Sequence, residues 1–154
     1  MSLETGDPLP DLTLPATGDR ELSLSDFRGR KLVIYFYPKD NTPGCTREGQ
    51  DFRDRYAEFQ AADCEVLGVS RDSVRSHENF AAKYDFPFPL LSDKDERMCQ
   101  AFGVIVQKKL YGREYLGVDR STWLFDADGT LTRSWRKVRV KGHVAEVLEA
   151  VNEL

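Results

Sequence analysis

The order of apolar and polar positions predicts strands that alternate with helices. Unbroken apolar and β-branched runs at 31–37 and 64–70 have the length and composition of buried strands. Apolar residues at helical spacing follow each run, as one helix from Pro43 to about 60–63 with a single buried stripe, and as a second over 73–84. This alternation predicts an α/β fold.

The rest of the chain contains further strand and helix signals. They are a strand or hairpin at 11–14, a helical turn at 25–29, a strand at 89–91, a helix at 94–102 capped by Asp93, strands at 111–118, 121–126 and 131–140, and a helix at 142–154. We expect the three late strands to form an antiparallel edge. Residues 1–154 are then one domain, with a mixed sheet, helices on both faces and an N-terminal extension.

The segment that joins the first strand to its helix contains the chemistry. Pro38 ends the strand, Thr42 suits the N-cap, Pro43 suits the first helical position, and Cys45 falls in the first turn. Unpaired backbone N–H groups and the positive end of the helix dipole favour thiolate over thiol there, so Cys45 is a candidate nucleophile. The alternative is a small apolar residue buried under a turn.

Net charge and hydropathy limit the classes of partner that this protein is expected to bind. The net charge is −4, from 22 basic and 26 acidic residues, which argues against nucleic-acid binding. The basic run 133–141 is therefore expected to be a solvated strand face. The N-terminus lacks the features of a secretory signal, and no apolar run approaches spanning length, so we expect a cytoplasmic protein with no membrane partner.

The cysteines and histidines argue against a metal centre. Three cysteines, at 45, 64 and 99, form neither a disulfide framework nor a metal-binding pattern, and two histidines add little. Cys64 and Cys99 are expected in the core, as is Trp123. We expect His77 to be a packing residue and His143 a surface residue, with no catalytic base between them.

Taken together, the motifs resemble those of the peroxiredoxins, and most closely their peroxiredoxin Q, or bacterioferritin-comigratory-protein, branch. The active-site signature is Pro38-x-x-x-Thr42-x-x-Cys45, within Tyr-Pro-Lys-Asp-Asn-Thr-Pro-Gly-Cys-Thr. The later blocks follow in the family's order: Leu67–Asp72, Phe88–Asp93, Phe102–Val104 and Arg120–Asp126. The resemblance implies a thioredoxin-like fold and the reduction of hydrogen peroxide or organic hydroperoxides by a cysteine, with no cofactor or metal.

The resemblance also implies a role for each site residue. Cys45 is the peroxidatic cysteine, which attacks the terminal peroxide oxygen and becomes a sulfenic acid. Thr42 bonds the peroxide, Arg120 stabilises the thiolate and the developing negative charge, Glu48 holds the arginine, and Pro38 shields the thiol from water. Each of three residues has a simpler alternative: Thr42 as only a helix cap, Arg120 as a solvated rim charge, and Glu48 as a carboxylate favoured by the helix dipole.

The second thiol departs from the family pattern. Members of this branch often carry a resolving cysteine at the positions that Gln50 or Ala81 occupies here. We therefore expect a one-cysteine enzyme whose sulfenic acid is reduced by an external thiol, either thioredoxin or glutathione with glutaredoxin. A monomer is expected.

Other classes of protein fit less well. A thiol–disulfide oxidoreductase would need a second cysteine where Glu48 stands, and a cysteine hydrolase would need a histidine base. A non-catalytic interaction module or a holdase chaperone on the same fold remains the alternative from another class.

Overall fold

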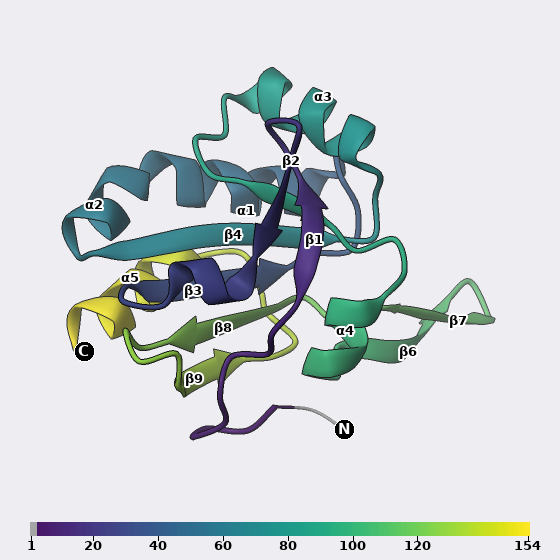
Figure 1. Ribbon diagram of the computed structural model, residues 1–154. Helices are drawn as coiled ribbons and strands as arrows, with labels where there is room; N and C mark the ends of the chain where they lie inside the picture. Colours follow the sequence, from purple (N-terminus) through teal and green to yellow (C-terminus); the bar gives the residue numbers. More distant parts are fainter. Residues whose placement is uncertain (1–2) are drawn as a thin grey trace.

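A central seven-stranded sheet organises the molecule, as Figure 1 shows for the computed structural model, which describes residues 3–154. The strands are β1 (Thr13–Ala16), β2 (Arg20–Ser23), β3 (Lys31–Phe36), β4 (Cys64–Ser70), β5 (Leu90–Ser92), β6 (Ile105–Leu110), β7 (Arg113–Val118), β8 (Ser121–Phe125) and β9 (Leu131–Trp135). The sheet order is β2-β1-β5-β4-β3-β8-β9. The β3–β4 and β4–β5 pairs are parallel and the others antiparallel, which confirms the expected mixed sheet.

Helices cover both faces of this sheet. They are the 3₁₀ turn η1 (Leu24–Phe27) and the helices α1 (Pro43–Asp54), α2 (Tyr56–Ala61), α3 (Val74–Tyr84), α4 (Arg97–Phe102) and α5 (His143–Asn152). The prediction of a single helix after Cys45 is wrong. The backbone leaves helical geometry at Arg55, and a second helix, α2, begins after it. Phe52 and Phe59 are nonetheless buried in one cluster, as the spacing predicted.

Two apolar clusters form, one on each face of the sheet. Strand β3 alternates between them, because successive side chains of a strand point to opposite faces. Leu32, Ile34 and Phe36 join the cluster that includes α4, whereas Val33, Tyr35 and Tyr37 join the cluster that includes α1, α2, α3 and α5. Cys45 belongs to the second cluster and Cys99 to the first. The sheet therefore separates these two thiols.

The late strands differ from the expectation. β7 does not extend the main sheet; it pairs with β6, which the sequence pattern missed, and the two form a separate hairpin. The polar triplet Gln107–Lys109 interrupts the apolar pattern of β6. The antiparallel edge of the main sheet is made by β8 and β9 instead, and β9 ends at Trp135 rather than at residue 140.

Two further elements have bounds that differ from the predicted ones. The N-terminal hairpin spans residues 13–23 rather than 11–14. Helix α4 begins at Arg97, because Glu96 takes a left-handed backbone conformation with φ 61°. Asp93 still caps the helix: its carboxylate accepts hydrogen bonds from the backbone N–H groups of Met98 and Cys99 at 3.1 and 2.7 Å.

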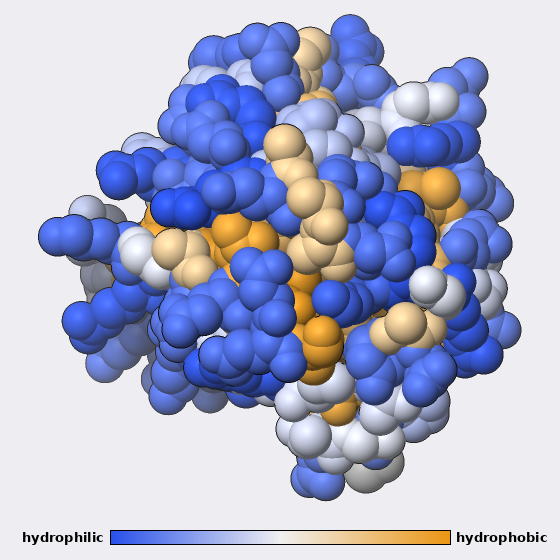
Figure 2. All heavy atoms as spheres, turned by 90° about the vertical axis from the view of Figure 1, so that its left-hand side faces the viewer, coloured by the Kyte–Doolittle hydropathy of each residue, from blue (hydrophilic) through white to orange (hydrophobic). Residues whose placement is uncertain are grey.

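The molecule presents a largely hydrophilic face on the side where α2 and α5 end. Figure 2 shows this face as mostly polar, with apolar residues visible near its middle. Within residues 3–154, no helix has both the length and the apolar character needed to cross a membrane.

Candidate active site

The loop between β3 and α1 places Cys45 at the start of a helix. Pro43 begins α1, Thr42 occupies the N-cap position, and Cys45 lies in the first turn with only 2% of its surface exposed. The expected cap hydrogen bond is absent: the Thr42 hydroxyl instead donates to the backbone carbonyl of Lys39 at 2.8 Å. Pro38 is half-buried at the start of the loop.

Arg120 reaches the cysteine from the far side of the chain. It follows β7, and its Nη2 lies 3.5 Å from the sulfur of Cys45 while its Nη1 donates to Oε1 of Glu48 at 2.8 Å. Gly44 allows this approach, because a Cβ there would lie 3.1 Å from Nη2 of Arg120. The side chain of Arg120 is only 18% exposed, so this residue is not the solvated rim charge of the alternative interpretation.

Glu48 is a fully buried carboxylate. It stands three residues after Cys45 on α1, and its Oε2 has no hydrogen-bond partner. Burial raises the pKa of Glu48 from 4.5 to about 7, although the charge and hydrogen bond of Arg120 oppose that shift. Desolvation alone would lower the pKa of Arg120, but the charges of Glu48 and Cys45 raise it on balance, so the guanidinium stays protonated.

A buried polar network ties the loop before Cys45 to α3. The carboxylate of Asp40 accepts hydrogen bonds from the hydroxyls of Tyr37 at 2.6 Å and Ser76 at 2.7 Å, and lies 2.7 Å from Nδ1 of His77. Nε2 of His77 faces the backbone carbonyl of Leu91 at 2.9 Å. His77 on α3 therefore links the loop at Asp40 to the backbone of β5.

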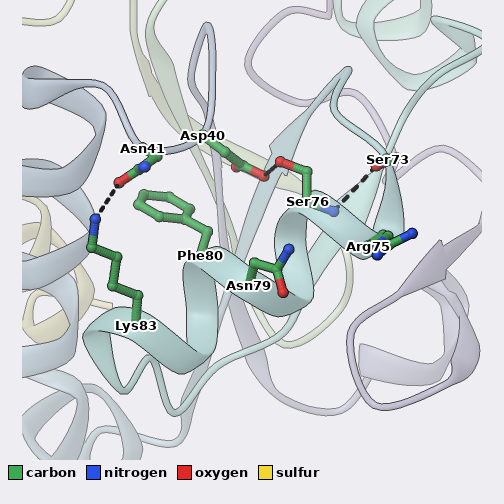
Figure 3. Close-up of a pocket in the computed structure, with 8 residues that line it drawn as sticks. All are labelled: Asp40, Asn41, Ser73, Arg75, Ser76, Asn79, Phe80 and Lys83. Carbon is green, nitrogen blue, oxygen red and sulfur yellow. Dashed lines mark hydrogen bonds between the residues drawn. The ribbon is translucent and has the colours of Figure 1, made fainter.

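A pocket opens beside this network, between the loop and α3. Figure 3 shows Asp40 and Asn41 on one side and the α3 side chains on the other, with Ser76 bonded to Asp40 and Lys83 to Asn41. Cys45 is not among its lining residues, which are Asp40, Asn41, Ser73, Arg75, Ser76, Asn79, Phe80 and Lys83. The pocket therefore borders the loop rather than the thiol.

One group of side chains in residues 3–154 has the donor atoms for a metal ion. Oxygen and nitrogen atoms of Asp40, Asp72 and His77 lie within 4.8 Å of one another. Hydrogen bonds already occupy these donors: both ring nitrogens of His77 face protein acceptors, and Oδ2 of Asp72 accepts from the Ser70 hydroxyl at 2.6 Å and from the Asp40 backbone N–H at 2.9 Å. The group is explained as a structural network.

The other two cysteines are buried away from Cys45. Cys64 begins β4 and pairs in register with Lys31, whereas Cys45 follows the opposite end of β3, about 20 Å along the strand direction. Burial raises the pKa of Cys64 to about 12, and burial together with Asp93 raises that of Cys99. Both thiols lie in the apolar clusters, as expected.

One histidine differs from its expected place. His143 is buried rather than on the surface: Nε2 lies 2.8 Å from the Thr122 hydroxyl, and the ring stands edge-on to Trp135. Burial lowers its pKa to about 4, so the ring is neutral near pH 7. Trp123 and His77 are buried as expected. No spacing pattern joins His77 to Asp40, which lies 37 residues earlier.

Comparisons with known proteins identify the family of this chain. The AhpC/TSA family model matches residues 5–134. This chain belongs to that family, the peroxiredoxins. It is 52% identical to "Peroxiredoxin Bcp" of Xanthomonas campestris over 92% of this chain and 88% of that protein, and 49% identical to "Putative peroxiredoxin bcp" of Coxiella burnetii over 96% and 98%.

Solved peroxiredoxin structures share the fold. The structure of a cysteine-to-serine mutant of Xylella fastidiosa PrxQ superposes with a TM-score of 0.95, is 42% identical, and covers 99% of this chain and 98% of that one. Xanthomonas campestris bacterioferritin comigratory protein, whose structures address alkyl peroxide reduction, gives 0.89 at 48% identity, over 96% and 98%. The peroxiredoxin described here therefore has the thioredoxin-like fold and is a thiol-dependent peroxidase.

Proposed function

We propose that Cys45 is the peroxidatic cysteine and that Arg120 and Glu48 prepare it for attack. The observation that carries this proposal is the guanidinium of Arg120, which contacts the sulfur of Cys45 with one nitrogen and the buried carboxylate of Glu48 with another. A fixed cation beside the sulfur stabilises the thiolate, the form that reacts with peroxides. We assign the hydroxyl of Thr42, at the N-cap position of the same helix, to bonding the peroxide.

The reaction follows from this geometry. The thiolate of Cys45 attacks the terminal oxygen of a hydroperoxide, the O–O bond breaks, and the departing oxygen takes a proton to leave as water or an alcohol. The sulfur is oxidised to the sulfenic acid and the peroxide is reduced. Arg120 stabilises the charge that grows on the departing oxygen, and the half-buried Pro38 limits the access of bulk water.

The regeneration step requires a thiol from outside the chain. Cys64 lies toward the opposite end of the strands and Cys99 on the opposite face of the sheet, whereas a disulfide needs Cα atoms roughly 4.4–6.8 Å apart. An external thiol attacks the sulfenic sulfur and releases water, and a second thiol cleaves the mixed disulfide to restore Cys45. Thioredoxin, or glutathione with glutaredoxin, are the candidate donors, acting on a monomeric enzyme.

The test is rapid-mixing tryptophan fluorescence of the reduced protein with hydrogen peroxide, beside Cys45→Ser and the matched variant Cys64→Ser. We expect a second-order signal that Cys45→Ser abolishes and Cys64→Ser retains. A signal that persists in Cys45→Ser, or unreacted Cys45 in the mass spectrum of the wild type, would contradict the assignment.

A further inference from the structure

The β6–β7 hairpin carries most of the exposed large apolar side chains in the described part of the chain. Five such side chains are exposed in residues 3–154, and four of them belong to the hairpin: Leu110, Tyr111, Tyr115 and Leu116. Tyr111, at the turn, is 95% exposed. By the strand register, Leu110 and Tyr115 lie on one face of the hairpin and Leu116 on the other, so the apolar side chains surround its tip. Single exposed apolar residues are ordinary, but four at the tip of one hairpin are typical of an interaction surface.

The shape of the hairpin makes this group a projection. β6 and β7 pair only with each other and extend away from the seven-stranded sheet (Figure 1). The last strand pair before the turn is Leu110 with Arg113, and Leu116 pairs with Gln107, three residues further back. At about 3.3 Å per residue, the apolar side chains occupy the outer ~10 Å of the hairpin.

Positive charge surrounds the same tip. Residues 105–118 contain the cations Lys108, Lys109 and Arg113 and a single carboxylate, Glu114, which accepts a hydrogen bond from Gln107 at 2.6 Å. The segment is therefore cationic although the whole chain has a net charge of −4. At physiological salt, charges beyond about 8 Å are screened, so the local sign decides what this tip attracts.

We propose that the tip of the β6–β7 hairpin docks on an anionic phospholipid bilayer. Leu110, Tyr111, Tyr115 and Leu116 enter the boundary between headgroups and acyl chains, while the exposed cations Lys109 and Arg113 contact lipid phosphates. The outer ~10 Å of the hairpin matches the depth of about 5–10 Å that interfacial elements reach, and tyrosine suits this boundary because one end is apolar and the other polar.

The size of the tip favours a bilayer over a protein partner. A stable protein interface buries about 800 Å² on each side, which needs roughly 20–30 residues, whereas the apolar tip offers four side chains on a projection. No apolar run in the sequence is long enough to span a membrane, and that length alone predicts no membrane partner. Docking at the surface needs no such run.

The base of this hairpin adjoins Arg120, which contacts Cys45. The inference therefore rests on the proposed function and extends it to a substrate class. Asp119 alone separates the end of β7 from Arg120. The side chain of Lys108 lies over Gly117 at the base of the hairpin, where a Cβ would come within 3.0 Å of it, and burial lowers the pKa of this lysine. A hydroperoxide group is polar and moves toward the headgroups, so a docked enzyme meets lipid hydroperoxides there.

Vesicle co-sedimentation tests the docking without using the activity. The reduced full-length protein is mixed with vesicles of equal parts phosphatidylcholine and phosphatidylglycerol, or of phosphatidylcholine alone. The tip variant is Leu110→Ser with Tyr111→Asn, because asparagine tolerates the left-handed backbone of residue 111, where φ is 52°. The matched control is Leu154→Ser, since Leu154 is an exposed large apolar residue outside the hairpin.

We expect the wild type and Leu154→Ser to sediment with anionic vesicles at low salt, and less at high salt. The tip variant loses at least about tenfold in partitioning, since burial of one leucine side chain alone is worth a factor of ten or more. Wild type that stays in the supernatant would overturn the docking, as would a dimer that only the tip variant dissociates, which would assign the surface to a second copy of this chain.

Peroxidase activity, measured on free hydrogen peroxide and on vesicles, is the second test. The tip variant should reduce free hydrogen peroxide at the wild-type rate but turn over phospholipid hydroperoxide in anionic vesicles about tenfold more slowly, in line with its loss of partitioning. Equal rates on vesicles would overturn the inferred substrate class. A protein that sediments but consumes no peroxide would refute the proposed function and leave the docking intact.

Discussion

Arg120 donates to a buried oxygen of Glu48 at 2.8 Å, although 72 residues separate them in the chain. Only 18% of the arginine side chain and none of the glutamate is exposed. The carboxylate fixes the direction of the guanidinium, and that direction brings Nη2 to the sulfur of Cys45. A donor that is already oriented needs no rearrangement when negative charge develops, which is why such groups stabilise transition states strongly.

Replacing Arg120 with glutamine should slow the reaction with peroxide by about 10²–10³-fold, the usual effect of removing one fixed donor from an active site. Arg120→Lys should be slowed as well, because an ammonium group cannot bridge two partners as the planar guanidinium does. Rapid-mixing fluorescence measures both rates. Arg133→Gln is the control, since Arg133 pairs with Glu146 on the exposed surface. Wild-type rates in both Arg120 variants would show that the contact with Cys45 is incidental.

Glu48 should make the protein less stable as pH rises. Its pKa is 4.5 when unfolded and about 7 when folded, so below 4.5 the group is neutral in both states. Between these values the folded state holds a proton that the unfolded state has released, and the free energy of unfolding falls by up to about 3 kcal/mol as pH rises through the interval. Urea unfolding across this range should show the decline in wild type and lose it in Glu48→Gln. An unchanged slope in the variant would assign it to other groups.

The central part of this fold could be predicted from the sequence because local signals and burial agree there. The run that forms β3 is apolar on both faces, and Pro43 and Cys45 stand where a helix starts. A buried strand followed by a helix satisfies both the local signals and the burial. The contact of Arg120 with Cys45 followed only from the family resemblance. Nothing local to residue 120 distinguishes it from a solvated arginine.

The errors occurred where tertiary contacts override local patterns. The apolar stripe through Phe52 and Phe59 continues across Arg55, so spacing alone gave no reason to end α1 there. β6 carries a polar triplet because its hairpin is exposed, and an exposed strand lacks the apolar signal of a buried one. The sequence pattern predicts a surface position for His143, but its burial depends on Thr122, 21 residues earlier, and on the ring of Trp135.

Asp40→Asn should destabilise the protein by about 1–3 kcal/mol, the cost of leaving groups of a buried hydrogen-bond network without a partner. Asparagine retains one acceptor oxygen, but its NH₂ group cannot accept a hydrogen bond, whereas both carboxylate oxygens of Asp40 accept one, from Tyr37 and from Ser76. Urea unfolding measures the change. Asp51→Asn is the control, because its partner Arg47 is largely exposed, and its cost should stay below about 1 kcal/mol. Equal losses in both variants would mean that the Asp40–His77 pair has no special weight.

Peroxide should not create a disulfide within the chain. Cys45 and Cys99 belong to apolar clusters on opposite faces of the sheet, and Cys64 lies toward the far end of β4, so neither thiol reaches the sulfenic acid without loss of the core. Intact mass after one equivalent of hydrogen peroxide should show one added oxygen, in wild type and in the Cys64→Ser and Cys99→Ser variants alike. A product lighter than the reduced protein by two hydrogen atoms, lost in one of these variants, would identify that cysteine as the resolving thiol. It would also require the chain to open far beyond the first turn of α1 during turnover.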